Sequence, residues 1–316
     1  MQQTLDGAVP LVSVALCTYN GTRFLAGQLE SLLGQDYPAF EIVAVDDASS
    51  DDTLAILENF RRRDSRLRVH RNSVNLGLNR NFERAFGLCR GDLIAPCDQD
   101  DIWLPQKLSA LVERIRGAQL AYCDSELVDE RGKPLGHRVS DRVTMYSGED
   151  PAVFALYNCV SGHAALFRRG VLEHARPFPE ERYYDWWLAF VAASLGRVEF
   201  VDRCLVQFRR HSLSTSGFAG IDPQARLLSA KPGPWFDRLR RIESPRRSLL
   251  TEMHRLSQAR SRQVVSFRLP LLLYRHRHAL FRLRRGGEWR NARRVMRYFW
   301  GRRYRKIGRQ APSFRI

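Results

Sequence analysis

Several familiar sequence signals are missing from this chain of 316 residues. No Gly-x-Gly-x-x-Gly and no Gly-x-x-x-x-Gly-Lys-Ser/Thr follows any expected strand, which argues against a dinucleotide-dependent dehydrogenase and against a P-loop enzyme. No apolar run reaches the length of about 18 residues that a membrane-spanning helix requires. No basic segment precedes the first apolar run, so we expect no signal peptide.

Cysteine and lysine are also sparse. The 6 cysteines show no Cys-x-x-Cys spacing, so the sequence indicates neither a zinc site nor a disulfide framework. Unpaired cysteines fit a reducing compartment, and we therefore expect a cytoplasmic protein. Lysine occurs only four times, so arginine carries nearly all of the positive charge.

The positive charge is concentrated near the C-terminus. Residues 221–316 hold 26 Lys and Arg against 5 Asp and Glu, a net charge of +21. Residues 1–220 hold the other 25 basic and 29 acidic residues, a net charge of −4, and the two regions together give the +17 of the whole chain. This asymmetry predicts a nearly neutral domain over 1–220 and a basic extension over 221–316.

The basic extension interleaves arginine with apolar and aromatic residues, for example at 264–274 and 298–300. Basic amphipathic helices with aromatic residues commonly lie in the membrane interface, and each basic residue near anionic lipid contributes about 1 kcal/mol. We predict a largely helical anchor that holds the protein peripherally on the inner face of the cell membrane. The alternatives are a solvated helical extension and a nucleic-acid-binding surface. Acidic strand ends elsewhere in the chain would repel a nucleic acid.

Expected strands and helices alternate through the first part of the chain. Alternation at this spacing predicts right-handed βαβ units, and hence an α/β fold with a mostly parallel sheet flanked by helices. A last strand is expected at 198–208, beyond this alternation. The alternating strands are expected at 11–17, 41–45, 67–70, 93–95 and 120–122, and the helices at 23–33, 53–62, 79–89 and 105–116.

Acidic residues directly follow two of these strands. Asp46 and Asp47 come after the run 41–45, and a second cluster, Asp98 to Asp101, comes after 93–95. In open α/β sheets ligands bind at this edge, where acidic side chains accept hydrogen bonds from a nucleoside. Two carboxylates at i and i+2 can also share a hard divalent cation. Helix capping is the alternative explanation, and it accounts poorly for two strands that both end in paired acids.

Four segments in order resemble the family-2 glycosyltransferases, which are inverting enzymes with a GT-A fold. The segments are 12–21, 45–49, 75–77 and 98–105, and the Asp-Gln-Asp-Asp-Ile-Trp sequence in the last one looks most like the bacterial rhamnosyltransferase-like branch. The resemblance implies sugar transfer from a nucleoside-diphosphate donor to a lipid-linked or polysaccharide acceptor in bacterial surface glycan synthesis. It favours dTDP-L-rhamnose as the donor, with a UDP-hexose as the alternative.

The same resemblance implies roles for individual residues. A Mn²⁺ or Mg²⁺ ion would neutralise the diphosphate leaving group as a Lewis acid. Asp98 would contact the donor's ribose or the metal shell, Asp100 would ligate the metal, and His211 is a candidate C-terminal metal ligand. For Asp101, a metal-site role and a helix cap both stay open. The donor pocket implied by the resemblance consists of Thr18, Tyr19, Asn20, Asp46, Asp47, Asn75, Gly77 and Asp98.

Inversion by a single displacement also needs a general base on the opposite side of the sugar from the diphosphate. Asp185 stands where the family carries an acid before a helix, although Tyr184 replaces the Glu or His that precedes it in many relatives. Aromatic neighbours would desolvate Asp185 and raise its pKa. The alternative is an N-cap aspartate ahead of a core-packed Trp pair. The residues predicted on the acceptor side are Gly162, His163, Trp186 and Trp187.

Overall fold

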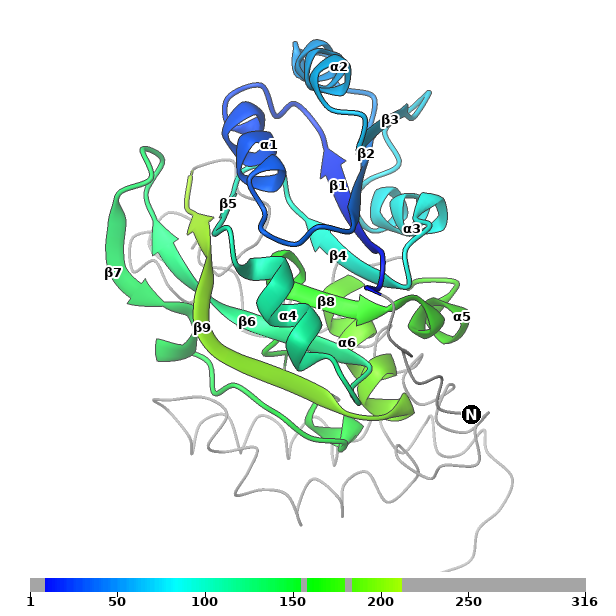
Figure 1. The fold of residues 1–316 in the computed structure, drawn as a ribbon, viewed down its shortest axis with the longest axis vertical. Coiled ribbons are helices and arrows are strands. Elements are labelled where there is room, and N and C mark those ends of the chain that lie inside the picture. Colours follow the sequence, from blue (N-terminus) through cyan, green and yellow to red (C-terminus); the bar gives the residue numbers. More distant parts are fainter. Residues whose placement is uncertain (1–8, 155–157, 180–183, 212–316) are drawn as a thin grey trace, which may run out of the picture.

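A single sheet of 9 strands organises the protein in the computed structural model (Figure 1), which describes residues 9–154, 158–179 and 184–211. The strand order is β3-β2-β1-β4-β8-β6-β9-β5, and β7 pairs with β6 outside this path. The predicted α/β class is confirmed. The basic extension predicted at 221–316 lies outside the described residues.

The N-terminal half of the sheet is parallel, as the alternation predicts. All residues of β1 are buried, as expected for a strand that helices cover on both faces. The strands of this half are β1 (Val12–Thr18), β2 (Phe40–Asp46), β3 (Leu67–Arg71) and β4 (Leu93–Cys97). The helices that connect them are α1 (Leu25–Leu33), α2 (Thr53–Arg63) and α3 (Leu78–Leu88).

The other half of the sheet is mixed. β8 (Ala165–Arg168) is antiparallel to both β4 and β6 (Leu120–Val128), whereas β9 (Val198–Arg209) is parallel to β6. The short β5 (Ile102–Trp103) pairs antiparallel with β9, and β7 (Pro134–Arg138) with β6. These pairings bring the end of β9 next to the segment that follows β4.

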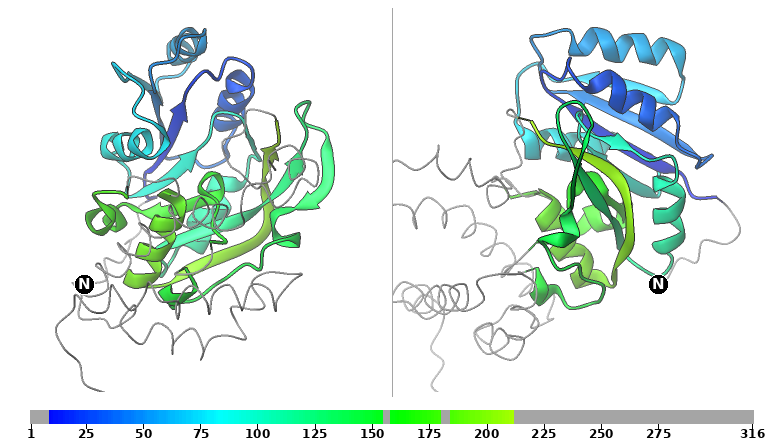
Figure 2. Two further views of the ribbon diagram at one scale, coloured as in Figure 1. Left: turned by 180° about the vertical axis from the view of Figure 1, so that it is seen from behind. Right: turned by 90° about the vertical axis from the view of Figure 1, so that its left-hand side faces the viewer.

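Helices cover both faces of the sheet, which gives three layers (Figures 1 and 2). Alternate residues of β1 enter different cores. Val12, Val14 and Leu16 pack in the core beneath α1, α2 and α4 (Lys107–Arg114). Ala15 and Cys17 pack in the core beneath α3, α5 (Leu172–Ala175) and α6 (Tyr184–Leu195). Within the described residues, none of the helices has both the length and the apolar composition needed to cross a membrane.

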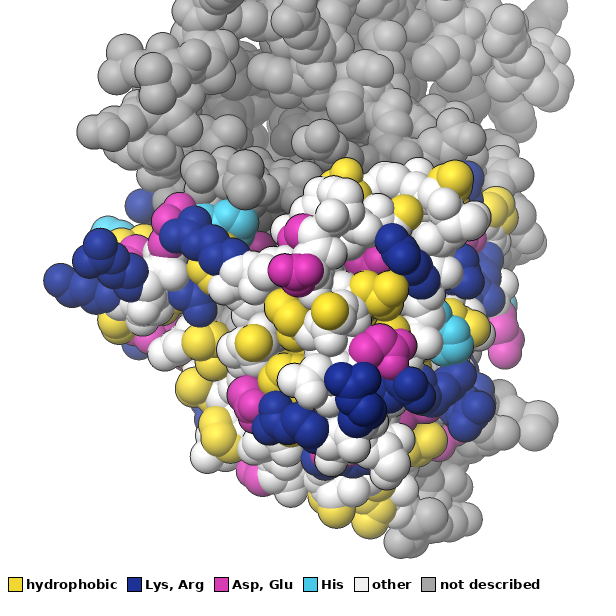
Figure 3. Space-filling model, turned by 90° about the horizontal axis from the view of Figure 1, so that it is seen from above, with side chains coloured by type: hydrophobic (Ala, Val, Ile, Leu, Met, Phe, Trp, Pro, Cys, Tyr) yellow, Lys and Arg dark blue, Asp and Glu magenta, His cyan; other side chains and the backbone are white. Residues whose placement is uncertain are grey.

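Acidic and basic side chains are interspersed on the described part of the face seen from above (Figure 3). This mixed surface agrees with the near-neutral charge of residues 1–220. The basic excess of the chain therefore belongs to the sequence beyond these residues.

Candidate active site

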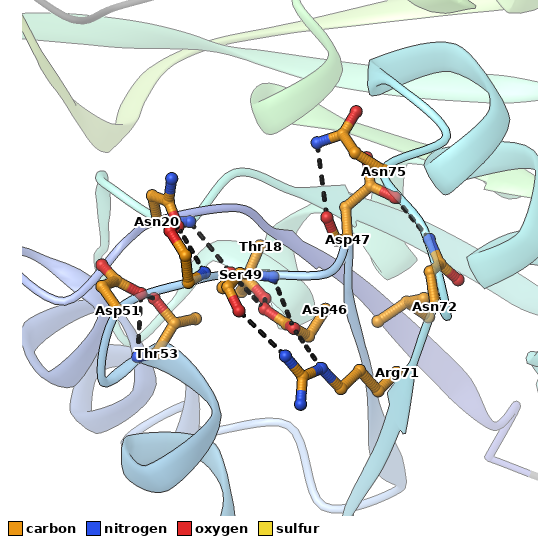
Figure 4. A network of polar contacts seen from close by, with 12 residues as sticks. Thr18, Asn20, Asp46, Asp47, Ser49, Asp51, Thr53, Arg71, Asn72 and Asn75 are labelled. Atoms are coloured by element: carbon orange, nitrogen blue, oxygen red, sulfur yellow. Dashed lines mark hydrogen bonds and ion pairs between the residues drawn. The ribbon is translucent and has the colours of Figure 1, made fainter.

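The loops after β1 and β2 are joined through the buried carboxylate of Asp46 (Figure 4). Its Oδ1 accepts a hydrogen bond from Thr18 Oγ1 at 3.2 Å. Its Oδ2 accepts one from the Ser49 backbone N–H at 3.0 Å and forms an ion pair with Arg71 Nε at 3.5 Å. The protein itself therefore supplies several donors to Asp46.

Asp47 holds the loop that follows β3 (Figure 4). Its carboxylate accepts hydrogen bonds from Asn72 Nδ2 at 2.5 Å, from Leu76 N at 2.8 Å and from Gly77 N at 2.9 Å. Asn75 Nδ2 donates to the Asp47 carbonyl at 3.3 Å. Gly77 has a φ of +78°, which glycine adopts without steric cost. Asp47 thereby fixes the segment that carries the predicted donor-site residues Asn75 and Gly77.

The turn after β1 is fixed from two sides. Asn20, with a φ of +47°, donates its backbone N–H to Ser49 Oγ at 2.9 Å, and its Oδ1 accepts a hydrogen bond from Ser50 N at 2.9 Å. On the other side, Gln99 Oε1 accepts from Tyr19 N at 2.8 Å, and Gln99 Nε2 donates to Tyr19 O at 3.0 Å. A Cβ at Gly21 would overlap the end of the Gln99 side chain, so a larger residue there would displace Gln99 from Tyr19.

The structure thus brings the residues predicted for the donor pocket to one edge of the sheet. Tyr19 is half exposed there, whereas Thr18, Asp46 and Asp47 are buried. Their binding of a nucleotide stays a prediction. The sequence interpretation did not single out Arg71 and Asn72, whose partners Asp46 and Asp47 are distant in sequence, and no local signal identifies them.

Asp100 and His211 meet at this same edge. Asp100 Oδ2 lies 2.8 Å from His211 Nε2. Arg209, at the end of β9, holds Asp100 close to His211. Its backbone N–H donates to Asp101 Oδ1 at 3.0 Å, and its Nε donates to the Asp100 carbonyl at 2.9 Å. The two predicted metal ligands, more than a hundred positions apart in the chain, are therefore neighbours.

A second cluster lies beside this pair and consists of Asp98, Asp101 and His163, with one ligand atom from each within 4.8 Å of the others. Asp101 is fully buried, and its Oδ2 has no hydrogen-bond partner among the described residues. Asp101 does not cap the next helix, since Gln106 is the residue before α4. Burial and the charges of Asp100 and Asp185 raise the pKa of Asp98 to about 7, and burial raises that of Asp101 well above its usual range.

These side chains fit a divalent cation. Their carboxylate oxygens and imidazole nitrogens are the donor types that Mg²⁺ and Mn²⁺ accept. The raised pKa of Asp98 and the unpartnered oxygen of Asp101 indicate negative charge that the protein alone does not fully compensate. A cation at this edge would supply that compensation.

His163, which was predicted on the acceptor side, lies close to the carboxylates of Asp98 and Asp101. The side chain is buried beneath the carboxylates, with Nδ1 3.7 Å from Asp101 Oδ2 and 3.9 Å from Asp98 Oδ2. Its Nε2 lies 3.0 Å from Ser125 Oγ. Burial lowers the pKa of His163 to about 3, assisted by the positive charges of Lys107 and Arg210. His163 is therefore neutral at physiological pH.

Asp185 lies in the first turn of α6. Its Oδ2 accepts a hydrogen bond from Gly162 N at 3.3 Å, and its Oδ1 accepts one from Trp186 N at 2.7 Å. Burial raises the pKa of Asp185 to about 6, although these backbone hydrogen bonds oppose the shift. Tyr184 stacks on Phe82 with ring centroids 4.1 Å apart. A Cβ at Gly162 would overlap the Tyr184 hydroxyl, so glycine is required here by a protein side chain.

Trp186 and Trp187 were also predicted on the acceptor side, and that role stays a prediction. Both side chains are buried, at 6% and 3% exposure. Their indole N–H groups donate to the backbone carbonyls of Phe154 and Ala175. Because α6 is apolar around most of its circumference, it packs inside the domain. The two tryptophans therefore anchor the helix that carries Asp185.

The family model described as Glycosyl transferase family 2 matches residues 13–176. An uncharacterized glycosyltransferase of Haemophilus influenzae is 27% identical over 220 residues, which are 66% of this chain and 68% of that protein. A Campylobacter jejuni protein named GalNAc(5)-diNAcBac-PP-undecaprenol beta-1,3-glucosyltransferase is 26% identical over 179 residues, or 55% of this chain and 57% of that protein.

Two solved structures share the fold. Staphylococcus aureus TarS 1–349 in complex with UDP-GlcNAc has a TM-score of 0.55 and 20% identity, and the match covers 79% of this chain and 72% of TarS. The mannosyltransferase PcManGT from Pyrobaculum calidifontis, in complex with GDP-Man and Mn²⁺, has a TM-score of 0.52 and 17% identity. That match covers 95% of this chain and 84% of the mannosyltransferase.

Proposed function

Because this chain belongs to glycosyl transferase family 2 and is a glycosyltransferase with a GT-A-like fold, we propose that it transfers a sugar from a nucleoside diphosphate with inversion and with the aid of a divalent cation. The contact between Asp100 and His211 carries the proposal, because two groups far apart in sequence converge beside Asp98. The charge of Asp185 acts on Asp98 as well, which supports a shared site for the metal and the base.

We assign the metal site to Asp98, Asp100 and His211. When bound, a Mn²⁺ or Mg²⁺ ion supplies positive charge to the diphosphate as the bond to the sugar breaks. The imidazole of His211 suits Mn²⁺ better than Mg²⁺, which prefers oxygen ligands. Arg209 keeps Asp100 and His211 together through its hydrogen bonds to Asp100 O and Asp101 Oδ1.

Asp185 acts in this proposal as the general base. Its carboxylate takes the proton from the acceptor hydroxyl while that oxygen forms the new bond to the anomeric carbon. The bond from that carbon to the diphosphate breaks, and the nucleoside diphosphate leaves with the bonding electron pair. With a pKa of about 6, Asp185 is ionised at neutral pH and basic enough to accept a proton.

The donor nucleotide would bind against the loops after β1, β2 and β3, where Tyr19 offers an exposed ring and Asp47 fixes the segment around Asn75 and Gly77. We propose dTDP-L-rhamnose as the donor. The Asp-Gln-Asp-Asp-Ile-Trp sequence at 98–103 supports this choice. A UDP-hexose is the alternative, in keeping with the UDP-GlcNAc bound by the structural neighbour TarS.

We propose a lipid-linked glycan as the acceptor and the inner face of the cell membrane as the place of action. The Campylobacter relative supports this assignment, because its name specifies an undecaprenol-linked acceptor. The net charge of +21 in residues 221–316 supports attraction to anionic lipid.

Binding of the full chain to anionic vesicles should fall sharply as salt is raised, while neutral vesicles should bind little at any salt concentration. Salt-independent binding to both vesicle types would contradict electrostatic anchoring.

A hydrolysis screen tests the chemistry. The purified full chain is incubated with dTDP-rhamnose, UDP-glucose, UDP-GlcNAc and GDP-mannose, each with Mn²⁺, with Mg²⁺ or with EDTA, and release of the nucleoside diphosphate is measured. We expect cation-dependent release from one donor above the others. Equal release in EDTA would contradict the metal proposal, and a preference for a UDP-hexose would replace rhamnose.

A further inference from the structure

One charged side chain behind the proposed metal site has no part in the chemistry described above. Lys107, the first residue of α4, is fully buried. A lysine is almost never fully buried unless its charge is matched by a partner. Burial lowers the pKa of Lys107 to about 7, while the charges of Asp98 and Asp101 act in the opposite direction and favour the ammonium form. The groups that contact Lys107 therefore indicate why its amine lies in the protein interior.

The amine of Lys107 lies between two groups that favour a cation. Its Nζ donates a hydrogen bond to the His163 carbonyl at 2.6 Å. It also lies over the ring of Trp103, 2.8 Å from the ring centroid, where the negative face of the ring attracts a cation. Trp103 belongs to the same segment as the acidic cluster, so Lys107 links that segment to the turn that contains His163.

His163 extends this link toward the carboxylates. Its Nδ1 lies 3.7 Å from Asp101 Oδ2 and 3.9 Å from Asp98 Oδ2. Its Nε2 lies 3.0 Å from Ser125 Oγ, within hydrogen-bond distance. The ring therefore lies between the acidic cluster and Ser125, which fixes its orientation.

The trio of Asp98, Asp101 and His163 also has the dimensions of a cation site. A second divalent ion bound there would be repelled by the ammonium group of Lys107. The carboxylates of Asp98 and Asp101 favour that ammonium form. The amine of Lys107 already lies at this depth, and a single ion at Asp98, Asp100 and His211 is the simpler arrangement.

The same turn reaches the proposed general base. The residue before His163 is Gly162, whose backbone N–H donates to Asp185 Oδ2 at 3.3 Å. The hydrogen bond from Lys107 to the His163 carbonyl therefore fixes a turn that contacts the metal side through its ring and the base side through its backbone.

We propose that Lys107, acting through His163, is a positioning residue that holds the carboxylates of the metal site and the base Asp185 in one arrangement. This inference rests on the proposed function. Partners that orient metal ligands typically change metal affinity by about 10- to 100-fold when removed. A residue that only stabilises the fold would lower the melting temperature without that change.

The test uses the full chain and three variants. Lys107→Met keeps the length and removes the donor and the charge. Leu108→Met, at a neighbouring buried position of α4, controls for altered packing. Ser125→Ala removes the other support of His163 and keeps Lys107. Mn²⁺ affinity is measured by titration calorimetry, and kcat and KM for donor hydrolysis are measured separately, alongside the melting temperature.

We expect Lys107→Met to weaken Mn²⁺ binding by about 10- to 100-fold and to lower kcat, with the Leu108→Met variant unchanged in both. Ser125→Ala should weaken Mn²⁺ binding in the same direction but less. Wild-type Mn²⁺ affinity in a folded Lys107→Met protein of lower melting temperature would overturn the proposal. If Lys107→Met does not fold, wild-type affinity in Ser125→Ala would overturn it. A wild-type chain that neither binds Mn²⁺ nor hydrolyses any nucleotide sugar would instead overturn the proposed function, and the inference with it.

Discussion

Two acidic clusters lie at the same edge of the sheet, and their surroundings differ. After β2, the carboxylates of Asp46 and Asp47 accept hydrogen bonds from neighbouring loops and side chains. After β4, a buried oxygen of Asp101 has no partner among the described residues, and the pKa of Asp98 is raised to about 7. The carboxylates of the first cluster shape the loops, whereas those of the second keep an oxygen free of hydrogen bonds within the described residues and suit a cation.

The difference concerns what each acid contributes to stability. A carboxylate that accepts several hydrogen bonds stabilises the fold, because its charge is matched and its donors are satisfied. Carboxylates crowded together without matching donors oppose each other's ionisation. A binding site can contain such mutually repelling carboxylates because a bound cation neutralises their charge.

Asp100→Ala should have the largest effect on activity and a small effect on stability. The variant loses a proposed metal ligand, so cation-dependent release of the nucleoside diphosphate should fall to the level seen in EDTA. The measurement is the donor hydrolysis assay with Mn²⁺, together with a thermal melt. Asp92→Ala, which removes an exposed acid one residue before β4, is the control. Normal turnover of soluble Asp100→Ala protein in EDTA would remove Asp100 from the metal site.

Asp185→Asn should reduce sugar transfer by about 10² to 10⁴, the usual contribution of a general base. The amide keeps the shape of the carboxylate but does not accept the proton. Donor affinity should hardly change, because the proposed base faces the acceptor. The measurement is kcat for transfer beside the donor dissociation constant. Weaker donor binding together with slower transfer would instead assign Asp185 to the nucleotide site or to the fold.

The pH dependence of transfer should report Asp185. Its pKa is raised to about 6, so below this value the carboxyl is protonated and unable to accept a proton. We expect kcat to fall by about tenfold for each pH unit below pH 6 and to level off above it. The profile is measured at saturating Mn²⁺ and donor. In Asp185→Asn the residual rate should lose this acidic limb, and an unchanged limb would assign it to another group.

Asp47→Ala should show the reverse pattern from Asp100→Ala. We expect a clear loss of stability and only a small direct effect on metal binding. The substitution leaves Asn72, Leu76 and Gly77 without their shared acceptor. Hydrogen bonds to a charged group contribute about 1.5 to 3 kcal/mol each, and relaxation of the loop into water recovers part of that. We expect the free energy of unfolding to fall by about 3 kcal/mol, measured by urea titration. Unchanged stability would show that Asp47 is not structural.

The parallel half of the fold could be predicted because buried strands appear as unbroken apolar runs. β1, β2, β3 and β4 lie where the apolar segments and their spacing indicate. β5 could not be predicted, since a strand of 2 residues exists only through its pairing with β9. Asp124 and Ser125 interrupt the apolar pattern of β6, which continues to Val128 rather than ending near 122.

The orientation of the residues predicted on the acceptor side could not be derived from the sequence. Trp186, Trp187 and His163 are residue types that commonly contact sugars or reacting groups, and the sequence does not state which way they face. The packing of α6 turns both tryptophans inward. The turn before β8 turns His163 toward Ser125 and the carboxylates.

The sequence alone determined the local features of this protein: buried strands, acidic residues at their ends, and a basic segment near the C-terminus. Contacts between distant segments of the folded chain determine which acids find partners. The two Asp pairs look alike in sequence, and their difference arises from chain segments far away. Residues of the loop after β3 satisfy Asp47, whereas β9 brings His211 to Asp100. Such distances depend on long-range strand pairing and helix packing, which a local pattern of residues does not encode.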